Sequence, residues 1–196
     1  MNHYNMIHFK VKTSLADSLK KIYKEVFFMQ KTQRLRPFAL FVSILVPLSI
    51  GGLASVLSNG MMKQYHFFNK PPLSPPGWAF PVVWTALYIL MGIASYLIVV
   101  SNGPRKEKLT ALALYAMQLA LNFCWPLLFF NYSMFLPAFF VLLAMLITTA
   151  LCTWRFFLLN RTAGFLMIPY IVWTLFAAYL NLSVYILSVT PSVALR

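Results

Sequence analysis

The chain has 196 residues, a hydrophobic content of 61% and a mean hydropathy of +0.75. Soluble domains are about 45–50% apolar, so this composition indicates an integral membrane protein. The three acidic residues, Asp17, Glu25 and Glu107, all lie outside the long apolar stretches. This placement excludes acid–base catalysis by paired carboxylates, a carboxylate metal cluster and a proton relay through intramembrane Asp or Glu.

The formal net charge of +13 raises the question of nucleic-acid binding. The basic residues flank apolar stretches and form no recognition motif, so no nucleic-acid partner is predicted. Cys124 and Cys152 lie within hydrophobic segments, as is typical of small apolar packing residues. His3 and His8 precede the first apolar span and His66 follows it, so no metal site is predicted within the spans.

Residues 1–36 form a basic tail that carries eight of the sixteen Lys and Arg residues. Within 14–29, apolar residues recur every three or four positions and lysines lie between them. Two interpretations stay open, namely an amphipathic helix on an anionic membrane surface or a poorly ordered tail. A signal peptide is not predicted, because the tail lacks an apolar core and a small-residue cleavage site.

Five apolar spans follow the tail and predict an all-α fold, a five-helix transmembrane bundle over 37–190. Each span is long enough to cross a hydrocarbon core of about 30 Å. The links between the last four spans are short, so neighbouring helices are expected to be antiparallel. The predicted spans are 37–59, 78–100, 109–130, 135–158 and 162–189.

The distribution of Lys and Arg predicts the orientation of this multi-pass protein. With the tail, 101–108 and 155–161 on one side of the membrane, that side carries thirteen of the sixteen basic residues. The positive-inside rule then predicts a cytoplasmic N-terminus and a C-terminus on the outer side.

The loop before the second span has the sequence KPPLSPPGW at 70–78. Its four prolines fix φ and remove backbone donors, so the loop is predicted to be stiff and extended in polyproline II form. It leads into a tryptophan-rich span and would hold aromatic rings at a defined height near the interface. This arrangement is a candidate mouth for a binding cavity.

Three spans contain an interior proline, at Pro47, Pro126 and Pro169. A proline inside a helix frees the carbonyl four residues earlier and bends the helix. Bent helices can leave a cavity between them, or they can be ordinary kinks of membrane helices with no cavity. Both interpretations stay open.

Helical spacing places aromatic and polar side chains on one face of the second, third and fifth spans. The amides of Gln118, Asn122 and Asn181 are costly in lipid and are therefore predicted to point into the bundle. They would either bond helices together or line a pocket for a flat, largely apolar ligand with a few polar edges. The aromatic members of these faces are Trp84, Tyr88, Tyr115, Trp125, Tyr170 and Trp173.

Three segments resemble the signature sequences of the TspO/MBR family, the translocator proteins or tryptophan-rich sensory proteins. They are 70–94, which begins with the proline-rich loop, 118–130, which includes QLALNFCWP, and 169–181, which begins with PYIVW. Pro47 and the pair Gly51–Gly52 fit the first helix of that family. The resemblance covers about 38–188 in the right order and spacing.

The resemblance implies a five-helix transmembrane bundle, commonly a homodimer, that binds porphyrins such as protoporphyrin IX. Some members bind sterols and benzodiazepine-type drugs. No cofactor is required, because the porphyrin is the ligand or the substrate, and the bacterial cell membrane is the expected location. The implied pocket lies beneath the first loop between the first, second and fifth helices, with a contribution from the third.

Carried over by motif, Trp84 and Trp173 correspond to pocket tryptophans that are linked in bacterial members to light-dependent porphyrin breakdown. They would be catalytic only if the chain carries out such photo-oxidation. Asn122 corresponds to a pocket amide, and Trp125 lies on the same helical face. The other implied wall positions are Pro76, Tyr88, Tyr170, Ala177 and Leu180, and the loop lid would contain Pro75 and Trp78.

One departure concerns sterol binding. The family's cholesterol-recognition pattern needs Lys or Arg within about five residues after a C-terminal tyrosine. Here the next basic residue after Tyr185 is Arg196, so a sterol role is not predicted.

Four function classes remain from the sequence. The leading one is a porphyrin-binding membrane protein with a sensory or regulatory role. The alternatives are an enzyme that degrades bound porphyrin in light, a facilitator of porphyrin transport, and a membrane protein that recruits partners. Coupled transport is disfavoured because no intramembrane carboxylate is present.

Overall fold

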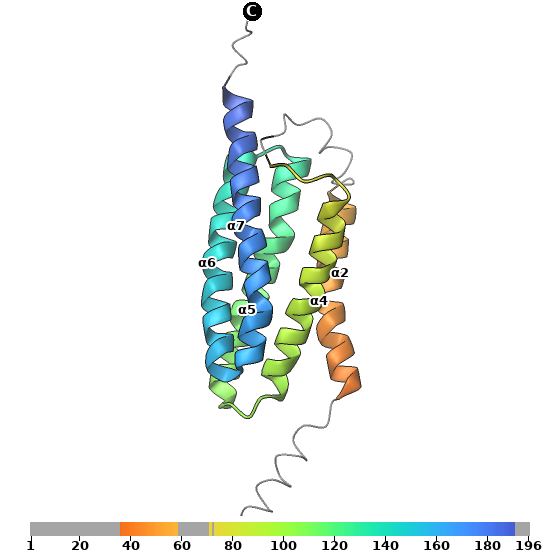
Figure 1. The fold of residues 1–196 in the computed structure, drawn as a ribbon, viewed down its shortest axis with the longest axis vertical. Helices are drawn as coiled ribbons and strands as arrows, with labels where there is room; N and C mark the ends of the chain where they lie inside the picture. The colour runs from red at the N-terminus through yellow and green to blue at the C-terminus, as the bar shows by residue number, and fades with distance from the viewer. Residues whose placement is uncertain (1–35, 59–70, 72, 191–196) are drawn as a thin grey trace, which may run out of the picture. The chain divides into compact units, whose positions relative to one another are not determined.

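The computed structural model describes residues 36–58, 71 and 73–190, which form a helical bundle (Figure 1). Within these ranges there is no β-strand, and five helices are long and apolar enough to cross a membrane. They are α2 (Pro37–Leu57), α4 (Ala79–Val100), α5 (Arg105–Pro126), α6 (Phe135–Leu159) and α7 (Arg161–Val189), and a π-helical segment η1 (Leu127–Asn131) continues α5. The predicted all-α membrane fold is therefore confirmed. The tail at 1–35, with its candidate amphipathic helix, lies outside the described residues.

Four predicted spans agree with the observed helices to within two residues, but the third begins earlier than expected. The prediction placed its start at residue 109, whereas α5 begins at Arg105. The prediction followed the apolar stretch, but Arg, Lys and Glu are good helix formers and extend the helix beyond it. Pro104 directly precedes α5, and Glu107 in the first turn suits the positive end of the helix dipole.

The proline-rich loop is not a continuous extended segment, which corrects the polyproline II prediction. The backbone N–H and the hydroxyl of Ser74 both donate to the carbonyl of Pro71, at 3.3 and 2.7 Å, and thereby close a turn. Leu73 has a φ of 67°, in the left-handed region. Proline fixes only its own φ, so the two residues between the proline pairs remain able to turn the chain.

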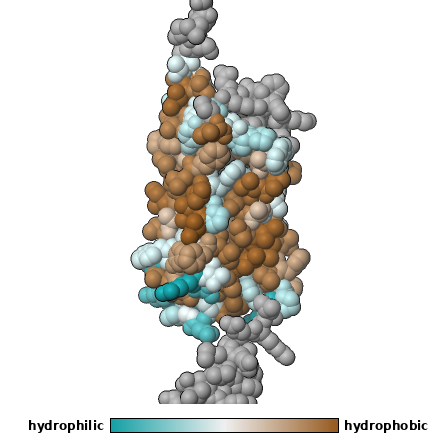
Figure 2. Space-filling model, in the orientation of Figure 1, coloured by the Kyte–Doolittle hydropathy of each residue, from teal (hydrophilic) through white to brown (hydrophobic). Residues whose placement is uncertain are grey.

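Helix α2 is the outermost helix of the bundle and contacts chiefly α4. Only Pro47, Gly51 and Ala54 are buried in it, and its other apolar side chains are half-buried or exposed, as expected of a helix with a large lipid-facing surface. Figure 2 shows hydrophobic residues over most of the visible helical surface, with the most strongly hydrophilic residues near the lower end of the bundle. At its C-terminal end, the Leu57 carbonyl accepts a hydrogen bond from Asn131 Nδ2 at 2.7 Å.

The backbones of α2 and α4 touch at Gly92. A Cβ atom at this position would lie 2.5 Å from Ile44 Cα and 2.8 Å from the Ser43 carbonyl oxygen. Glycine is therefore required here for steric reasons, in the manner of small residues at membrane helix crossings.

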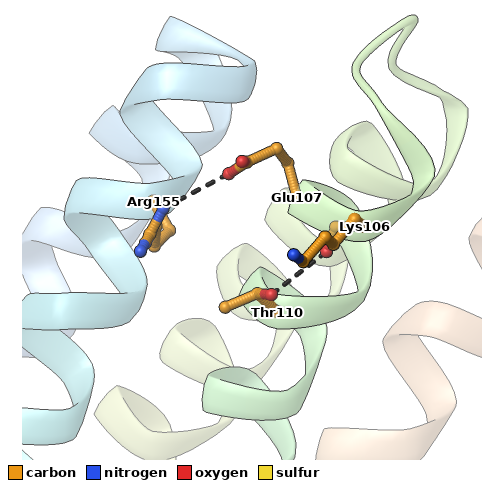
Figure 3. Close-up of polar contacts among 4 residues, drawn as sticks. All are labelled: Lys106, Glu107, Thr110 and Arg155. Atoms are coloured by element: carbon orange, nitrogen blue, oxygen red, sulfur yellow. Dashed lines mark hydrogen bonds and ion pairs between the residues drawn. The ribbon is translucent and has the colours of Figure 1, made fainter.

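A polar cluster joins the ends of α4, α5 and α6 near the two short links. Arg155 on α6 forms an ion pair with Glu107 on α5, with Nη1 and Oε2 3.2 Å apart (Figure 3). One turn further along α5, the Thr110 hydroxyl donates to the Lys106 carbonyl. Lys108 Nζ donates to the Val99 carbonyl at 2.7 Å and thus satisfies a free carbonyl at the end of α4.

The interior of the bundle is formed by the predicted faces of α4, α5 and α7, together with α6. Gln118, Asn122 and Asn181 are at most 1% exposed, so the prediction that these amides point inward is confirmed. Helix α6 packs between α5 and α7, and its buried residues are mostly small or flexible: Ala138, Leu142, Met145, Thr148, Thr149, Cys152, Thr153 and Phe156.

Candidate functional site

A partly open cavity of about 280 Å³ lies between α2, α4 and α5. Its walls are mostly aromatic and apolar, with a few hydroxyl groups and one amide. The lining residues are Leu48, Gly51, Gly52, Ala54 and Ser55 of α2, Phe80, Pro81, Trp84, Thr85 and Tyr88 of α4, and Asn122, Trp125 and Pro126 of α5.

Two adjacent glycines of α2 have different effects on this cavity. A Cβ atom at Gly51 would lie 2.0 Å from Tyr88 Cε2, so the Tyr88 ring packs directly on the backbone of α2. A Cβ atom at Gly52 would meet no atom within 4 Å. Gly51 therefore sets the position of the Tyr88 ring, whereas Gly52 leaves open space.

The indole of Trp84 is the centre of the aromatic wall. It stacks on Tyr88 with ring centroids 5.5 Å apart and an interplanar angle of 29°. The centroids of Trp125, Tyr170 and Trp173 lie 6.4, 6.1 and 6.5 Å from it. Because Trp125 comes from α5 and the last two from α7, the Trp84 ring connects the cavity with the opposite side of the bundle.

Hydrogen bonds hold the polar back of the cavity in one arrangement. The Tyr88 hydroxyl donates to Asn122 Oδ1 at 2.7 Å, and Asn122 Nδ2 donates to the Tyr170 hydroxyl at 2.9 Å. The amide of Asn122 thus both joins three helices and lines the cavity, so the two roles proposed for it are compatible.

The buried amide of Asn181 has only the role of joining helices. Trp125 Nε1 donates to Asn181 Oδ1 at 3.0 Å, and Asn181 Nδ2 donates to the Phe135 carbonyl at 2.7 Å. It connects α5, α6 and α7 and does not line the cavity. Its bond to Trp125 also fixes the indole plane of that residue, and Trp125 does line the cavity.

Of the residues predicted for the site, the structure brings four to the cavity wall: Trp84, Tyr88, Asn122 and Trp125. The predicted residues of α7 do not line it. Tyr170 is completely buried and Trp173 half-buried behind Trp84, while Ala177 and Leu180 are buried further along α7. The cavity therefore differs from the one implied by the resemblance, because the Trp84 ring lies between it and α7.

The predicted loop positions also lie outside the lining. Pro75 and Pro76 precede α4, and Trp78, directly before the helix, is 65% exposed. No contact in the described part of the chain makes Trp78 a lid.

Several lining residues were not among the predicted site residues. A signal existed for Phe80, since it lies four residues before Trp84 and eight before Tyr88 and so shares their helical face. Its ring also packs edge-on against Trp173, with centroids 6.0 Å apart. Thr85 and Ser55 carry no comparable signal, because the side of a helix that meets a cavity depends on its neighbours.

The chemistry available in this site comes from aromatic rings, hydroxyls and an amide. Within 36–58, 71 and 73–190, no group of three or more His, Cys, Asp or Glu residues is placed to hold a metal ion. Such a wall suits the face of a flat apolar molecule, with Asn122 and the hydroxyls at its polar edge.

Comparison with known proteins agrees with the membrane-spanning bundle. The TspO/MBR family model matches residues 43–187, which include every lining residue. The chain is 39% identical over 117 residues to the tryptophan-rich sensory protein of Cereibacter sphaeroides, covering 60% of this chain and 72% of that protein. It is 41% identical over 142 residues to the translocator protein of Ovis aries, covering 70% and 82%. Protein CrtK of Rhodobacter capsulatus is 30% identical over 135 residues, covering 69% and 83%. The chain therefore belongs to the TspO/MBR family.

Proposed function

We propose that this membrane protein binds a tetrapyrrole of the protoporphyrin IX type in the cavity between α2, α4 and α5, and that it has a sensory or regulatory role. The observation that carries the proposal is the stacked pair Trp84 and Tyr88 in the wall of a cavity that Gly52 leaves open on the α2 side. A cavity walled by aromatic rings favours a planar ligand.

The size of the cavity adds a condition to this proposal. Ligand pockets usually enclose about 300–1,000 Å³, so a cavity of about 280 Å³ is at the lower limit and admits only part of a macrocycle. Helix α2 is the least buried span, because 17% of its most apolar 18-residue stretch is buried in the bundle, compared with 50% for α4. We therefore expect α2 to move outward when the ligand enters.

The names of the relatives support a role at the membrane in sensing or transport. One relative is called a tryptophan-rich sensory protein and another a translocator protein. Passive facilitation of porphyrin transport is therefore an alternative. A flux assay in vesicles containing the protein, with empty vesicles as control, distinguishes it from simple binding.

The proposal is tested by titrating the protein in nanodiscs with protoporphyrin IX in the dark while recording tryptophan fluorescence. We expect saturable quenching, and an affinity at least about tenfold weaker in Trp84→Ala because the stacking surface is lost. Trp154→Ala is the matched control, since Trp154 lies on α6, is 55% exposed and does not line the cavity. Absence of saturable quenching, or equal affinity in Trp84→Ala, would refute the proposal.

A second candidate function is light-dependent oxidative breakdown of the bound porphyrin by molecular oxygen. The observation that favours it is the close set of rings around Trp84, which includes Trp173 at 6.5 Å. An indole in such a set can act as an electron or radical partner of the excited porphyrin. Trp84→Phe and Trp173→Phe should then retain binding but lose the light-dependent decay of porphyrin absorbance. Undiminished decay in both variants would remove this function.

Three finer expectations belong to the same proposal: a homodimer, a cytoplasmic N-terminus and location in a bacterial cell membrane. The homodimer and the bacterial membrane are expected from the family. The cytoplasmic N-terminus is expected from the concentration of Lys and Arg in the tail, 101–108 and 155–161. Labelling of a single cysteine introduced at Lys106 by a membrane-impermeant reagent tests the orientation. Labelling in intact cells would contradict it.

A further inference from the structure

A group of buried polar atoms without partners lies in the bundle, separate from the cavity. Tyr115 Oη, both amide atoms of Gln118 and Thr149 Oγ1 have no hydrogen-bond partner within the described part of the chain. Gln118 and Thr149 are 0% exposed, and Tyr115 is 6% exposed. None of the three lines the cavity.

These side chains come from two packed helices, α5 and α6. Tyr115 and Gln118 are one turn apart on the same face of α5. On α6, Cys152 Sγ lies 3.8 Å from the Ala111 carbonyl, which is one turn before Tyr115. Because α5 and α6 are antiparallel neighbours, Thr149, one turn before Cys152, lies near the level of Tyr115, and Gln118 follows one turn further along α5.

Two further polar side chains border this group. Ser95 on α4 lies within hydrogen-bonding reach of the Tyr115 hydroxyl, and Tyr170 on α7 lies within reach of the Thr149 hydroxyl. The Ser95 hydroxyl donates to the Gly92 carbonyl within its own helix, so its oxygen remains able to accept a hydrogen bond. This part of the bundle therefore contains hydroxyl groups contributed by α4, α5, α6 and α7.

A buried amide whose donors and acceptor are all unpaired is strongly destabilising in the interior of a membrane protein. The Gln118 amide offers two donors and an acceptor, and each hydroxyl keeps one bonding function beyond its contact with Ser95 or Tyr170, which together match the bonding capacity of water. Buried water binds where several polar groups converge, whereas apolar cavities stay dry. We propose that Gln118, Tyr115 and Thr149 form an internal water-binding site, holding one or more waters between α5 and α6.

The site is connected to the ligand cavity by a directed chain of hydrogen bonds. Tyr88 in the cavity wall donates to Asn122, and Asn122 donates to the Tyr170 hydroxyl. Since that hydroxyl oxygen accepts from Asn122, its own proton can point to Thr149 and the water site. A ligand that displaces the Tyr88 hydroxyl would thus change the hydrogen bonding at the water site, although the two sites share no residue.

The test compares two buried positions on α5 in the ligand-free full chain. Gln118→Met keeps the side-chain volume but removes the amide. If water is bound, this change removes the amide that bonds it and leaves the water with fewer hydrogen-bond partners. The melting temperature should then fall by about 3–8 °C. Leu119→Met, an apolar swap at the neighbouring buried position, should change it by about 2 °C or less. If the amide is dry and unpaired, Gln118→Met should instead raise the melting temperature, which would overturn the proposal.

A direct measurement covers the case in which Gln118→Met does not fold. A high-resolution structure of the wild-type protein in lipid should show ordered water within hydrogen-bond distance of the Gln118 amide and of Tyr115 or Thr149. An amide bonded only to protein atoms, or no density between these side chains, would overturn it. Because no porphyrin is used, failure of porphyrin binding leaves this result unaffected.

Discussion

The two sides of the bundle differ in how their helices are held together. On the cavity side, formed by α2, α4 and α5, small residues of α2 meet large rings of α4, and a space remains between them. On the packed side, formed by α5, α6 and α7, side chains such as Met145 and Phe156 are completely buried and Asn181 bonds across all three helices. We therefore expect stability to reside mainly on the packed side, which leaves room on the cavity side for the proposed ligand.

The largest expected effect comes from a substitution that disrupts the packed side. Asn181→Ala removes the acceptor of the buried Trp125 Nε1 and the donor to the half-buried Phe135 carbonyl. We expect a loss of stability of about 2–4 kcal/mol, measured by thermal unfolding in detergent. The control is Ser183→Ala, whose hydroxyl bonds only within its own helix. Equal melting temperatures for the two variants would show that the Asn181 bonds do not stabilise the bundle.

The next effect concerns the two glycines of the cavity side. Gly51→Ala places a methyl group against the Tyr88 ring and should cost about 1–3 kcal/mol while weakening binding of protoporphyrin IX. Gly52→Ala is the matched control and should leave stability nearly unchanged, because no atom lies near the added Cβ. Thermal unfolding and fluorescence titration of both variants give the comparison. A Gly51→Ala variant as stable as Gly52→Ala contradicts the placement of the Tyr88 ring.

A smaller change sharpens the role of the polar back of the cavity. Tyr88→Phe removes the donor to Asn122 Oδ1 and keeps the stacked ring. We expect a loss of about 1 kcal/mol in stability, since one buried hydrogen bond is lost. The control is Tyr132→Phe, because Tyr132 is 68% exposed. If Tyr88→Phe unfolds at the same temperature as Tyr132→Phe, the bond contributes nothing measurable.

The smallest effect lies outside both sides, at the ion pair of Glu107 and Arg155. The two side chains are 49% and 34% exposed, so solvent screens their attraction. Arg155→Gln should therefore reduce stability by no more than about 1 kcal/mol, and by less at high salt. Thermal unfolding at low and high ionic strength measures this. A loss as large as that in Asn181→Ala would mean that the pair is more than a screened surface contact.

Local sequence patterns were sufficient for each helix considered alone. Uninterrupted apolar stretches predicted five spans because a helix must be about 20 residues long to cross a bilayer. Helical spacing placed Trp84 and Tyr88 on one face, and the cost of an amide in lipid predicted that Gln118, Asn122 and Asn181 point inward. The early start of α5 was missed because charged residues interrupt hydropathy without interrupting a helix.

What the tertiary structure decided is which of these faces meet. Periodicity orients a side chain around its own helix axis, but it does not determine the rotation and distance of the neighbouring helix. For this reason the sequence could not show that Gly51, and not Gly52, contacts Tyr88, or that Trp84 separates the cavity from Trp173. Nor could it distinguish Asn181, which has two partners, from Gln118, which has none among the described residues, although both are inward-facing amides. The sequence by itself thus determined the membrane fold and the residue types of its interior, and packing between helices determined where those residues form a cavity, a bond or an internal polar site.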